Sequence, residues 1–354
     1  REAAAVIDIT PLYKYVISGP DATRLLDRVM TRDVSKLQVN QVSYTPWCDE
    51  EGKVIDDGTL TRLTETSYRV TAADPCYRWF VLNATDLDVT IDDVSEGTAG
   101  LALQGRLTRP VLEAATDETW EDVRYFRRRL SSIAGVEVDV TRTGYTGDHG
   151  YELFMPAEDA LRVWDRLFEV GEAYGIRAAG INALDVSRVE AGLILIEVEY
   201  TSARHAISEE QTYSPFEIGL GRFVAFGKAS DFNGRRALLA EQAAGGPPRR
   251  LVGLELEWAG IEGMFAKHGL APMISPFVQR DPVPVYRESR QIGRATSMVW
   301  SPTLKKMIAF GSVEAAFERL GTRLAVEYSV EGERGNVDAH VVNLPFLDLE
   351  RKRA

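Results

Sequence analysis

The sequence predicts an α+β protein of several domains, the last of which is a small β-barrel. Strand and helix patterns alternate irregularly between Tyr13 and Leu193, unlike the regular alternation of a parallel βαβ sheet. The stretch Ala243-Ala-Gly-Gly-Pro-Pro248 has the composition of a linker, because glycines loosen the chain and prolines end a helix. Beyond it the sequence consists mostly of short strand patterns separated by turns, which is typical of a barrel.

The region before the linker supplies two groups of elements. The first group has expected strands at 15–17, 42–45, 59–63, 68–72 and 87–91, and helices at 21–30 and 77–82. The second has strands at 100–104, 127–132, 137–142 and 152–155, and helices at 109–115, 157–174 and 179–193. In the helix at 157–174 the apolar positions recur with a period of 3.6, at Leu161, Trp164, Leu167 and Phe168. Residues 1–8 resemble the end of a helix without a capping residue or an initiator Met, so we expect a preceding segment.

After the linker, a further domain is expected to begin near Arg249. Its strands are predicted at 251–256, 284–286, 292–297, 308–312, 323–328 and 337–342. The short strands and the turns between them predict the small barrel.

Composition excludes several classes of protein. The chain has 354 residues, of which 45% are hydrophobic, and a net charge of −12 that disfavours binding to a phosphate backbone. Cys48 and Cys76 are too few for a disulfide framework and no secretory signal is present, so a cytoplasmic location is expected. No apolar run is long enough to span a membrane. The four histidines are scattered and no CxxC pair occurs, so no metal site is expected.

Two short segments have the residue types of a functional site. In Gly52-Lys-Val-Ile-Asp-Asp57 the adjacent acids point to opposite sides of a strand, and burial of one can raise its pKa toward the range of a general acid. A solvated hairpin explains the same residues equally simply. In Arg142-Thr-Gly-Tyr-Thr-Gly-Asp-His-Gly-Tyr-Glu152 three glycines permit a tight loop that a ligand can approach closely.

In order and in context, these segments resemble the glycine-cleavage T-protein, or aminomethyltransferase, family. The resemblance covers nearly the whole chain. Besides the two segments above, it rests on Gly19-Pro-Asp-Ala, Asp93-Val-Ser-Glu, Ala102-Leu-Gln-Gly105, Asp185-Val-Ser-Arg-Val-Glu-Ala-Gly192, Ser214-Pro-Phe-Glu-Ile-Gly-Leu220, Asp231-Phe-Asn-Gly-Arg-Arg-Ala-Leu238 and Ser301-Pro-Thr-Leu304.

The resemblance implies a three-domain cloverleaf ring, T-protein-like, with a C-terminal small β-barrel domain and with tetrahydrofolate in the central opening. The corresponding division is a discontinuous T-protein-like domain at 1–16 plus 98–245, a ferredoxin-like α+β domain at 17–97, and the barrel at 249–354.

The resemblance also implies roles for single residues. The family's catalytic aspartate falls on Asp57, and its folate contacts fall on Glu152, Tyr145, Tyr125 and Tyr44. A glutamate can accept two hydrogen bonds from the aminopyrimidine edge of a pterin, and tyrosines can pack on its flat rings. Each also has an ordinary structural explanation: Tyr145 as a turn aromatic, Glu152 as a strand-edge acid, and the other tyrosines as core-to-surface residues.

The chain departs from the family pattern on the side that faces the one-carbon donor. T-proteins carry an Asn where this chain has Thr71, an Arg where it has Leu184, and a Tyr-Gly-Gln-Asp-like stretch near residues 199–205. The loss of these hydrogen-bond donors favours a less polar or differently shaped donor. Trp47 either lines the pocket for the donor or packs in the core. The segment Arg127-Arg-Arg129 is either a basic patch that binds an anionic donor or a solvated face of the protein.

Three functions remain open on the sequence alone. The leading hypothesis is a tetrahydrofolate-dependent methyltransferase that demethylates a small O-, N- or S-methyl compound and yields 5-methyltetrahydrofolate. The alternative is aminomethyl transfer from a lipoyl carrier protein, as in the glycine-cleavage T-protein, which requires that protein as a partner. The third is a folate-binding assembly factor on the same fold, without transfer chemistry.

Overall fold

The computed structural model describes residues 1–353 and divides them into two compact units. The first unit contains residues 1–181, 223–235 and the C-terminal residues from 349 onward, and the second contains residues 182–222 and 236–348. The chain therefore leaves the first unit twice and returns to it twice.

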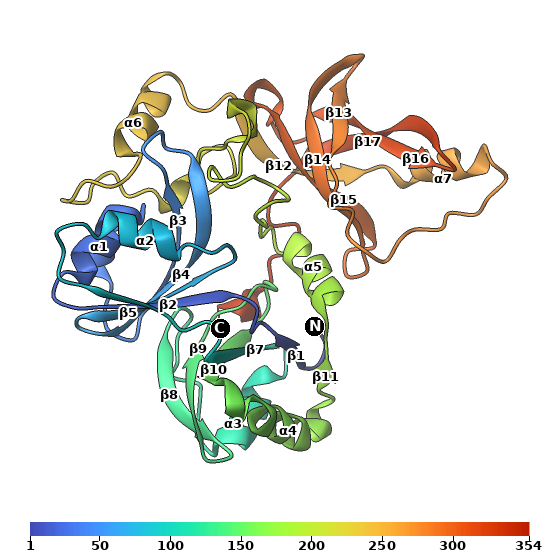
Figure 1. Cartoon of the computed structure of the whole chain (residues 1–354). Helices are drawn as coiled ribbons and strands as arrows, with labels where there is room; N and C mark the ends of the chain where they lie inside the picture. The colour runs from blue at the N-terminus through green and yellow to red at the C-terminus, as the bar shows by residue number, and fades with distance from the viewer. Residues whose placement is uncertain (354) are drawn as a thin grey trace. The chain divides into compact units, whose positions relative to one another are not determined.

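A five-stranded antiparallel sheet forms one half of the first unit. Its order is β3 (Val42–Cys48), β4 (Val54–Thr64), β5 (Ser67–Ala72), β2 (Tyr13–Ser18) and β6 (Thr90–Asp93). Helices α1 (Ala22–Val29) and α2 (Tyr77–Asn83) lie beside each other on this sheet (Figure 1). Both helices bury an apolar side, which includes Leu25 and Leu26 on α1 and Phe80 on α2.

A six-stranded sheet forms the other half. Its order is β11 (Arg177–Ala178), β1 (Ala5–Asp8), β7 (Thr98–Gln104), β10 (Gly150–Pro156), β9 (Val136–Thr141) and β8 (Arg128–Ile133). Helices α3 (Thr108–Thr116) and α4 (Ala160–Gly171) run side by side (Figure 1) and share a hydrophobic core with the sheet, in which Leu112, Trp120 and Leu167 are fully buried.

Two expectations for this half are wrong. Residues 1–8 do not continue a helix, because β1 pairs with β7 and β11 and buries the β-branched Val6 and Ile7. In α4 only Leu161 departs from the expected pattern, since it is 76% exposed, whereas Leu167 is buried with Val163, and Trp164 and Phe168 pack against the same core.

A buried lysine is one of the residues that hold the segment 223–235 to the first unit. The ammonium group of Lys228 donates hydrogen bonds to the backbone oxygens of Met30 at 2.8 Å and Arg32 at 3.0 Å, and it forms an ion pair with Asp27 at 3.4 Å. Burial lowers the pKa of Lys228, and the charge of Asp27 opposes this effect. Lys228 therefore fastens this later segment to the C-terminal end of α1.

The second unit is built on a closed six-stranded barrel. Its strands, in order around the barrel, are β12 (Arg249–Leu256), β15 (Lys306–Glu314), β14 (Arg290–Ser301), β13 (Val283–Arg287), β16 (Arg323–Val330) and β17 (Glu333–Val342). Its helices are α5 (Ile181–Glu190), α6 (Arg235–Ala243) and α7 (Trp258–Ala266). Val189 of α5 packs with Ile308 and Phe310 of the barrel wall.

The predicted fold class is confirmed, with three sheets, flanking helices and a C-terminal barrel whose strands occupy the expected places (Figure 1). The division into three domains stays a prediction. In the structure β2 begins at Tyr13, ahead of the predicted boundary at residue 17, and residues from 349 onward belong to the first unit. Among residues 1–353 no helix is both long and apolar enough to cross a membrane.

Candidate functional site

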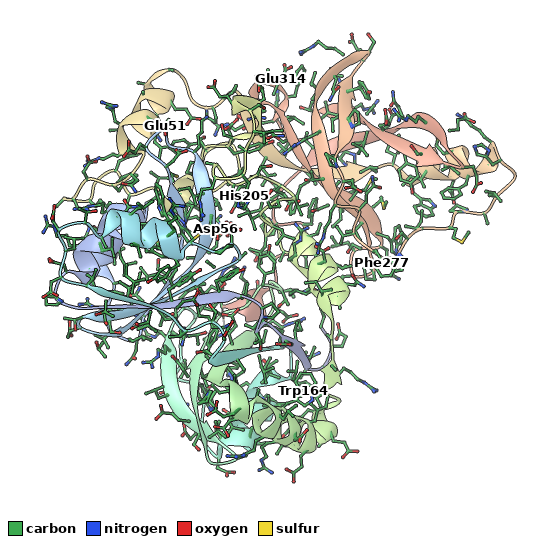
Figure 2. All side chains as sticks on the ribbon, in the orientation of Figure 1. Glu51, Asp56, Trp164, His205, Phe277 and Glu314 are labelled. Atoms are coloured by element: carbon green, nitrogen blue, oxygen red, sulfur yellow. The ribbon has the colours of Figure 1, made fainter. Side chains whose placement is uncertain are left out.

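The two adjacent acids on β4, Asp56 and Asp57, have different environments. Asp56, which is labelled in Figure 2, is completely buried, whereas Asp57 is half-buried. The carboxylate of Asp56 accepts hydrogen bonds from the backbone N–H of Asp57 at 2.7 Å and of Asp74 at 3.0 Å. Burial raises the pKa of Asp56 well above its ordinary value, and the neighbouring Asp57 raises it further. Asp56 thus fixes the backbone beneath the site, and Asp57 is the acid on the accessible side.

Tyr44 lies against Asp57. Because Pro46 is the cross-strand partner of Asp57, Tyr44, two residues earlier on β3, is its diagonal neighbour on the same face. The Tyr44 hydroxyl donates a hydrogen bond of 2.5 Å to Oδ2 of Asp57, and the edge of the Tyr44 ring contacts Phe223 at 5.0 Å between centroids. Burial and the charge of Asp57 raise the pKa of Tyr44, so the phenol remains a donor at neutral pH.

The glycine-rich loop at 142–149 is shaped by Gln104, on β7. The Gln104 amide donates to the backbone oxygens of Thr143 at 3.2 Å and Tyr151 at 3.3 Å, and its oxygen accepts from Thr146 Oγ1 at 2.7 Å. A Cβ at Gly144 would lie 2.1 Å from that Gln104 oxygen, so the glycine makes room for this side chain.

Tyr145 lies in this glycine-rich loop. Tyr145 is half-buried, and it is among the groups whose charge raises the pKa of Tyr44, which places the two phenols near each other. The structure therefore joins Asp57 and Tyr44 by a hydrogen bond, and Tyr145, about a hundred residues later in the sequence, contributes to the raised pKa of Tyr44.

Glu152 lies on β10, at the base of the same loop. Its Oε2 accepts a hydrogen bond of 2.5 Å from the hydroxyl of Thr143, while Oε1 has no partner among residues 1–353. Burial raises the pKa of Glu152, and the Thr143 hydroxyl and the charge of Arg69 offset part of this rise. The residue is half-buried, so one carboxylate oxygen remains available to a ligand.

Tyr125 is the remaining tyrosine that was expected to contact the folate. It is half-buried in the turn before β8, where its ring contacts Phe126 edge to face at 4.5 Å, and its charge acts on the buried Arg142. These contacts place Tyr125 beside the first residue of the glycine-rich loop, and none of them joins it to Asp57 or Glu152.

Arg69 was not identified by sequence reasoning. On β5 it forms an ion pair with Asp139 of β9 at 2.5 Å, and its guanidinium lies 3.9 Å from the ring centroid of Phe154 on β10. It links the two sheets and adds positive charge near Glu152. A single arginine in a strand gives no sequence signal for such a role.

No metal site accompanies these groups. Across residues 1–353 no three His, Cys, Asp or Glu side chains are placed so that they can hold a metal ion.

Comparison with known proteins identifies the family of the chain. Residues 1–228 match the family described as the GCVT N-terminal domain, and residues 249–348 match the glycine cleavage T-protein C-terminal barrel domain. The chain belongs to the glycine-cleavage T-protein family. It is therefore an enzyme of the tetrahydrofolate-dependent methyltransferase/aminomethyltransferase class.

Several T-protein relatives are similar over most of their length. The aminomethyltransferase of Caldanaerobacter subterraneus subsp. tengcongensis is 36% identical over 92% of this chain and 81% of its own. The aminomethyltransferase of Halalkalibacterium halodurans is 35% identical over 98% of this chain and 87% of its own. The aminomethyltransferase of Clostridium botulinum (strain Loch Maree) is 31% identical over 99% of this chain and 88% of its own. The glycine cleavage system aminomethyltransferase T of Bartonella henselae has the same fold, with a TM-score of 0.80, 24% identity and coverage of 98% and 87%.

The positions at which this chain departs from the family pattern lie in both units. Thr71 is buried on β5 and Leu184 is half-buried on α5. Glu199 is buried and accepts hydrogen bonds from Arg188 at 2.7 Å and Thr296 at 3.1 Å, so it holds the second unit together. Trp47 is fully buried and packs on Phe80, which makes it a core residue.

Proposed function

We propose that this T-protein transfers a one-carbon unit to tetrahydrofolate, with Asp57 as the catalytic residue. The observation that carries the proposal is the 2.5 Å hydrogen bond between Tyr44 and the half-buried Asp57, beside Tyr145. A carboxylate that is accessible on one side and held on the other is suited to orient a reacting amine or to move a proton.

The residues present fit a reduced folate. Glu152 has one oxygen held by Thr143 and one without a protein partner, and an ionised carboxylate accepts the two hydrogen bonds that the aminopyrimidine edge of a pterin offers. Tyr145 in the loop and Tyr125 in the turn before β8 supply ring faces against which the flat parts of the molecule can pack. When bound, tetrahydrofolate supplies the nitrogens that accept the one-carbon unit.

Tyr44 acts on Asp57 as a positioning residue. Its hydroxyl holds Oδ2, and Asp56 holds the backbone N–H of Asp57, so both the main chain and the carboxylate of the catalytic residue are fixed. Fixed orientation of reacting groups can supply up to roughly 7–11 kcal/mol of barrier reduction.

For the donor, we propose an aminomethyl group attached to a lipoyl carrier protein. The relatives named aminomethyltransferase support this choice, since they share 31–36% identity with this chain along most of both sequences. Demethylation of a small methyl compound is the second candidate. It is favoured by Thr71 and Leu184, where the family pattern has an amide and a guanidinium. A cytoplasmic location is part of the proposal for either donor.

One experiment separates the donors. The protein is incubated with tetrahydrofolate and either an aminomethylated lipoyl carrier protein or a panel of methoxy-aromatic, methylamine, betaine and sulfonium compounds, and the folate products are identified by mass. Methylenetetrahydrofolate formed only with the carrier supports aminomethyl transfer. If 5-methyltetrahydrofolate appears with a small compound instead, the demethylase is correct.

The variant Asp57→Asn tests the catalytic residue. We expect kcat to fall by about 10²–10⁴, the usual contribution of a positioned acid or base, while the affinity for folate changes little. Unchanged turnover would contradict the role of Asp57. Tight folate binding by the wild-type chain with no product from any donor would contradict transfer altogether and favour the assembly factor.

A further inference from the structure

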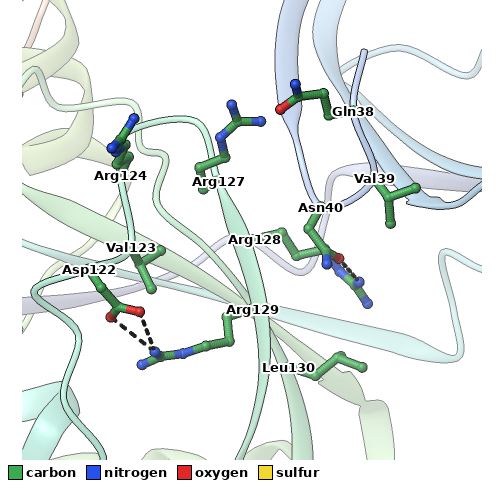
Figure 3. Close-up of a pocket in the computed structure, with 10 residues that line it drawn as sticks. All are labelled: Gln38, Val39, Asn40, Asp122, Val123, Arg124, Arg127, Arg128, Arg129 and Leu130. Atoms are coloured by element: carbon green, nitrogen blue, oxygen red, sulfur yellow. Dashed lines mark hydrogen bonds and ion pairs between the residues drawn. The ribbon is translucent and has the colours of Figure 1, made fainter.

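Arginine side chains line a pocket in each of the two units. The pocket of the first unit has a volume of about 580 Å³ and is lined by residues 38–40, 122–124 and 127–130 (Figure 3). The last two of these groups flank Tyr125, so this pocket belongs to the candidate folate site. The pocket of the second unit has a volume of about 300 Å³ and is lined by Arg249, Gln291, Gly293, Arg294 and Ser312. None of these five residues has a part in the proposed function.

The barrel strands place three of these side chains in a row on the outer face of the barrel. Strands β12, β15 and β14 are neighbours in the barrel wall (Figure 1). Arg294 on β14 is the cross-strand partner of Ser312 on β15, and Arg249 on β12 is the diagonal neighbour of Ser312 on the other side. The next residues along β15 and β14, Val313 and Ala295, belong to the barrel core. Because side chains alternate along a strand, the row faces outward.

A buried tyrosine holds the two arginines of this row. The guanidinium groups of Arg249 and Arg294 lie 4.4 and 5.3 Å from the ring centroid of Tyr213, which is fully buried. Contact with a ring face holds a guanidinium in place without neutralising its charge. Two positive groups are therefore kept at one ring although they repel each other.

The charge of Arg249 is compensated within the protein. Its Nε–H donates to Oε1 of Glu217 at 2.9 Å, and its other nitrogens donate to two backbone oxygens at 3.1 Å. Glu314, the cross-strand partner of Arg249, is bonded instead to Arg290, at 2.5 and 2.9 Å. Arg249 therefore forms part of the wall of the pocket, and Glu314 is not available to the other arginine.

The charge of Arg294 has no such compensation. Among residues 1–353 it has no acidic partner, and its Nη2 makes a long hydrogen bond of 3.5 Å to the backbone oxygen of Glu199. Its Nε–H is buried without a partner in the same part of the chain. The carboxylate of Glu199 is engaged by Arg188 and Thr296. A guanidinium has five N–H donors, so the protein leaves most of those of Arg294 unused.

Two neutral donors accompany Arg294 in the pocket. The hydroxyl of Ser312 has no hydrogen-bond partner among residues 1–353. The amide of Gln291 donates to the backbone oxygen of Gly293 at 3.3 Å and has a second N–H to offer. The net charge of the chain is −12, so an uncompensated guanidinium with two further donors stands out from the rest of the molecule and suits an anion.

We propose that this pocket binds the carboxylate of a small organic molecule, with Arg294 as the main contact and Ser312 and Gln291 as further donors. A guanidinium binds the two oxygens of a carboxylate through two parallel hydrogen bonds. The volume of about 300 Å³ is at the lower end for small-molecule sites, so the ligand is small. The inference does not depend on the proposed function, because the pocket lies in the second unit and Asp57 and Glu152 lie in the first.

The first test compares benzoate with benzamide, two probes of the same size that differ in charge and in the second oxygen. Their affinities for the protein are measured by ligand-observed NMR. We expect benzoate to bind about tenfold more tightly, as one charge-assisted hydrogen bond provides, and to lose much of this advantage at high salt. Equal affinities at low salt would overturn the proposal.

Variants locate the bound probe. Arg294→Gln should weaken binding of benzoate about tenfold, and Arg294→Lys should also weaken it, because lysine cannot form two parallel hydrogen bonds. Ser312→Ala, a small change that does not remove a charge, should weaken it about threefold. Arg334→Gln removes the same charge from an exposed site on β17 and should keep the wild-type affinity. If Arg294→Gln retains that affinity, or fails to fold while Ser312→Ala retains it, benzoate binds elsewhere and the proposal is wrong.

Competition identifies the source of the negative charge. Acetate and succinate should displace benzoate from the wild-type protein, as expected for a site that recognises a carboxylate. If inorganic phosphate displaces benzoate more strongly than either of them, the pocket is a general anion site and the proposal is overturned. It is also overturned if none of these small anions competes and a lipoyl carrier protein does, since the carboxylate would then come from a protein side chain.

Discussion

Tyr44 gives the sharpest prediction at the scale of single residues. In Tyr44→Phe the ring and its contact with Phe223 remain, and only the hydrogen bond to Asp57 is lost. We expect kcat to fall by about tenfold, the equivalent of one hydrogen bond to a charged group, with little change in KM for folate. Tyr13→Phe on β2 is the matched control. If the loss of stability, expressed as a free energy, is as large as the free energy that corresponds to the fall in kcat, Tyr44 is only structural.

Glu152 predicts a pH dependence of folate binding. Its pKa is raised, mainly by burial, and the proposed interaction with the pterin needs the ionised carboxylate. Affinity should therefore fall as the pH decreases through this raised pKa, at a higher pH than for an ordinary exposed glutamate. Titration calorimetry between pH 4 and 8 measures this, and Glu152→Gln should bind weakly and without the pH-dependent step. A flat profile for the wild-type protein would exclude Glu152 from the contact.

For single residues, the sequence predicted the accessible residues of the site but not the residues that hold them in place. Asp57, Tyr44, Tyr145 and Glu152 belong to short motifs that resemble a known family. Arg69 and Gln104 act through partners that lie 70 and about 40 residues away in the sequence. Such contacts depend on how the strands are ordered in the sheets, which a local pattern does not contain.

The glycine-rich loop is the element for which a substitution is most informative. A Cβ at Gly144 would lie 2.1 Å from the Gln104 side chain, which also bonds both sides of the loop. We expect Gly144→Ala to lower the free energy of unfolding by about 1–3 kcal/mol through overpacking and to weaken folate binding by moving Tyr145. Urea denaturation measures the change in the free energy of unfolding. Gly180→Ala, at a position with open space, is the control, and equal stability of the two variants would contradict this account of the loop.

Element boundaries and types could be predicted where periodicity is strong. The barrel strands and most helices lie at the expected positions because alternation and the 3.6 period persist along them. Helix α7 was not predicted, since it contains Gly260 and Gly263, which disfavour helix. Burial of Ile261, Met264 and Phe265 in the barrel core outweighs this local preference.

At the scale of the whole molecule, the C-terminal residues complete the first unit. Arg351 binds both oxygens of the buried Asp148, at 2.7 and 2.9 Å, and holds the pKa of that carboxyl below its ordinary value against the effect of burial. We expect Arg351→Ala to destabilise the first unit by about 2 kcal/mol, the range for hydrogen bonds to charged groups. Because Asp148 has a lowered pKa, this loss should be present at neutral pH and disappear as the pH falls through that pKa. Glu350→Gln, an exposed neighbour, is the control for chemical denaturation at pH 7 and pH 3.

The return of the chain to the first unit could not be predicted from the sequence. Lys228 reaches Asp27 across 201 positions, and Arg351 reaches Asp148 across 203. Neither residue stands in a pattern that signals such a partner, and the linker composition at 243–248 marks only the start of the barrel.

The segment fastened by Lys228 also affects how the protein is made. On the ribosome, both sheets of the first unit emerge before residues 223–235, and Arg351 emerges later still. The Arg351–Asp148 contact of the first unit can therefore form only after the barrel has been synthesised, and until then the early strands are more exposed to chaperones and to misfolding. A nascent chain that is interrupted within the barrel cannot form the Arg351–Asp148 contact, so even long truncated products should be removed rather than accumulate as folded protein.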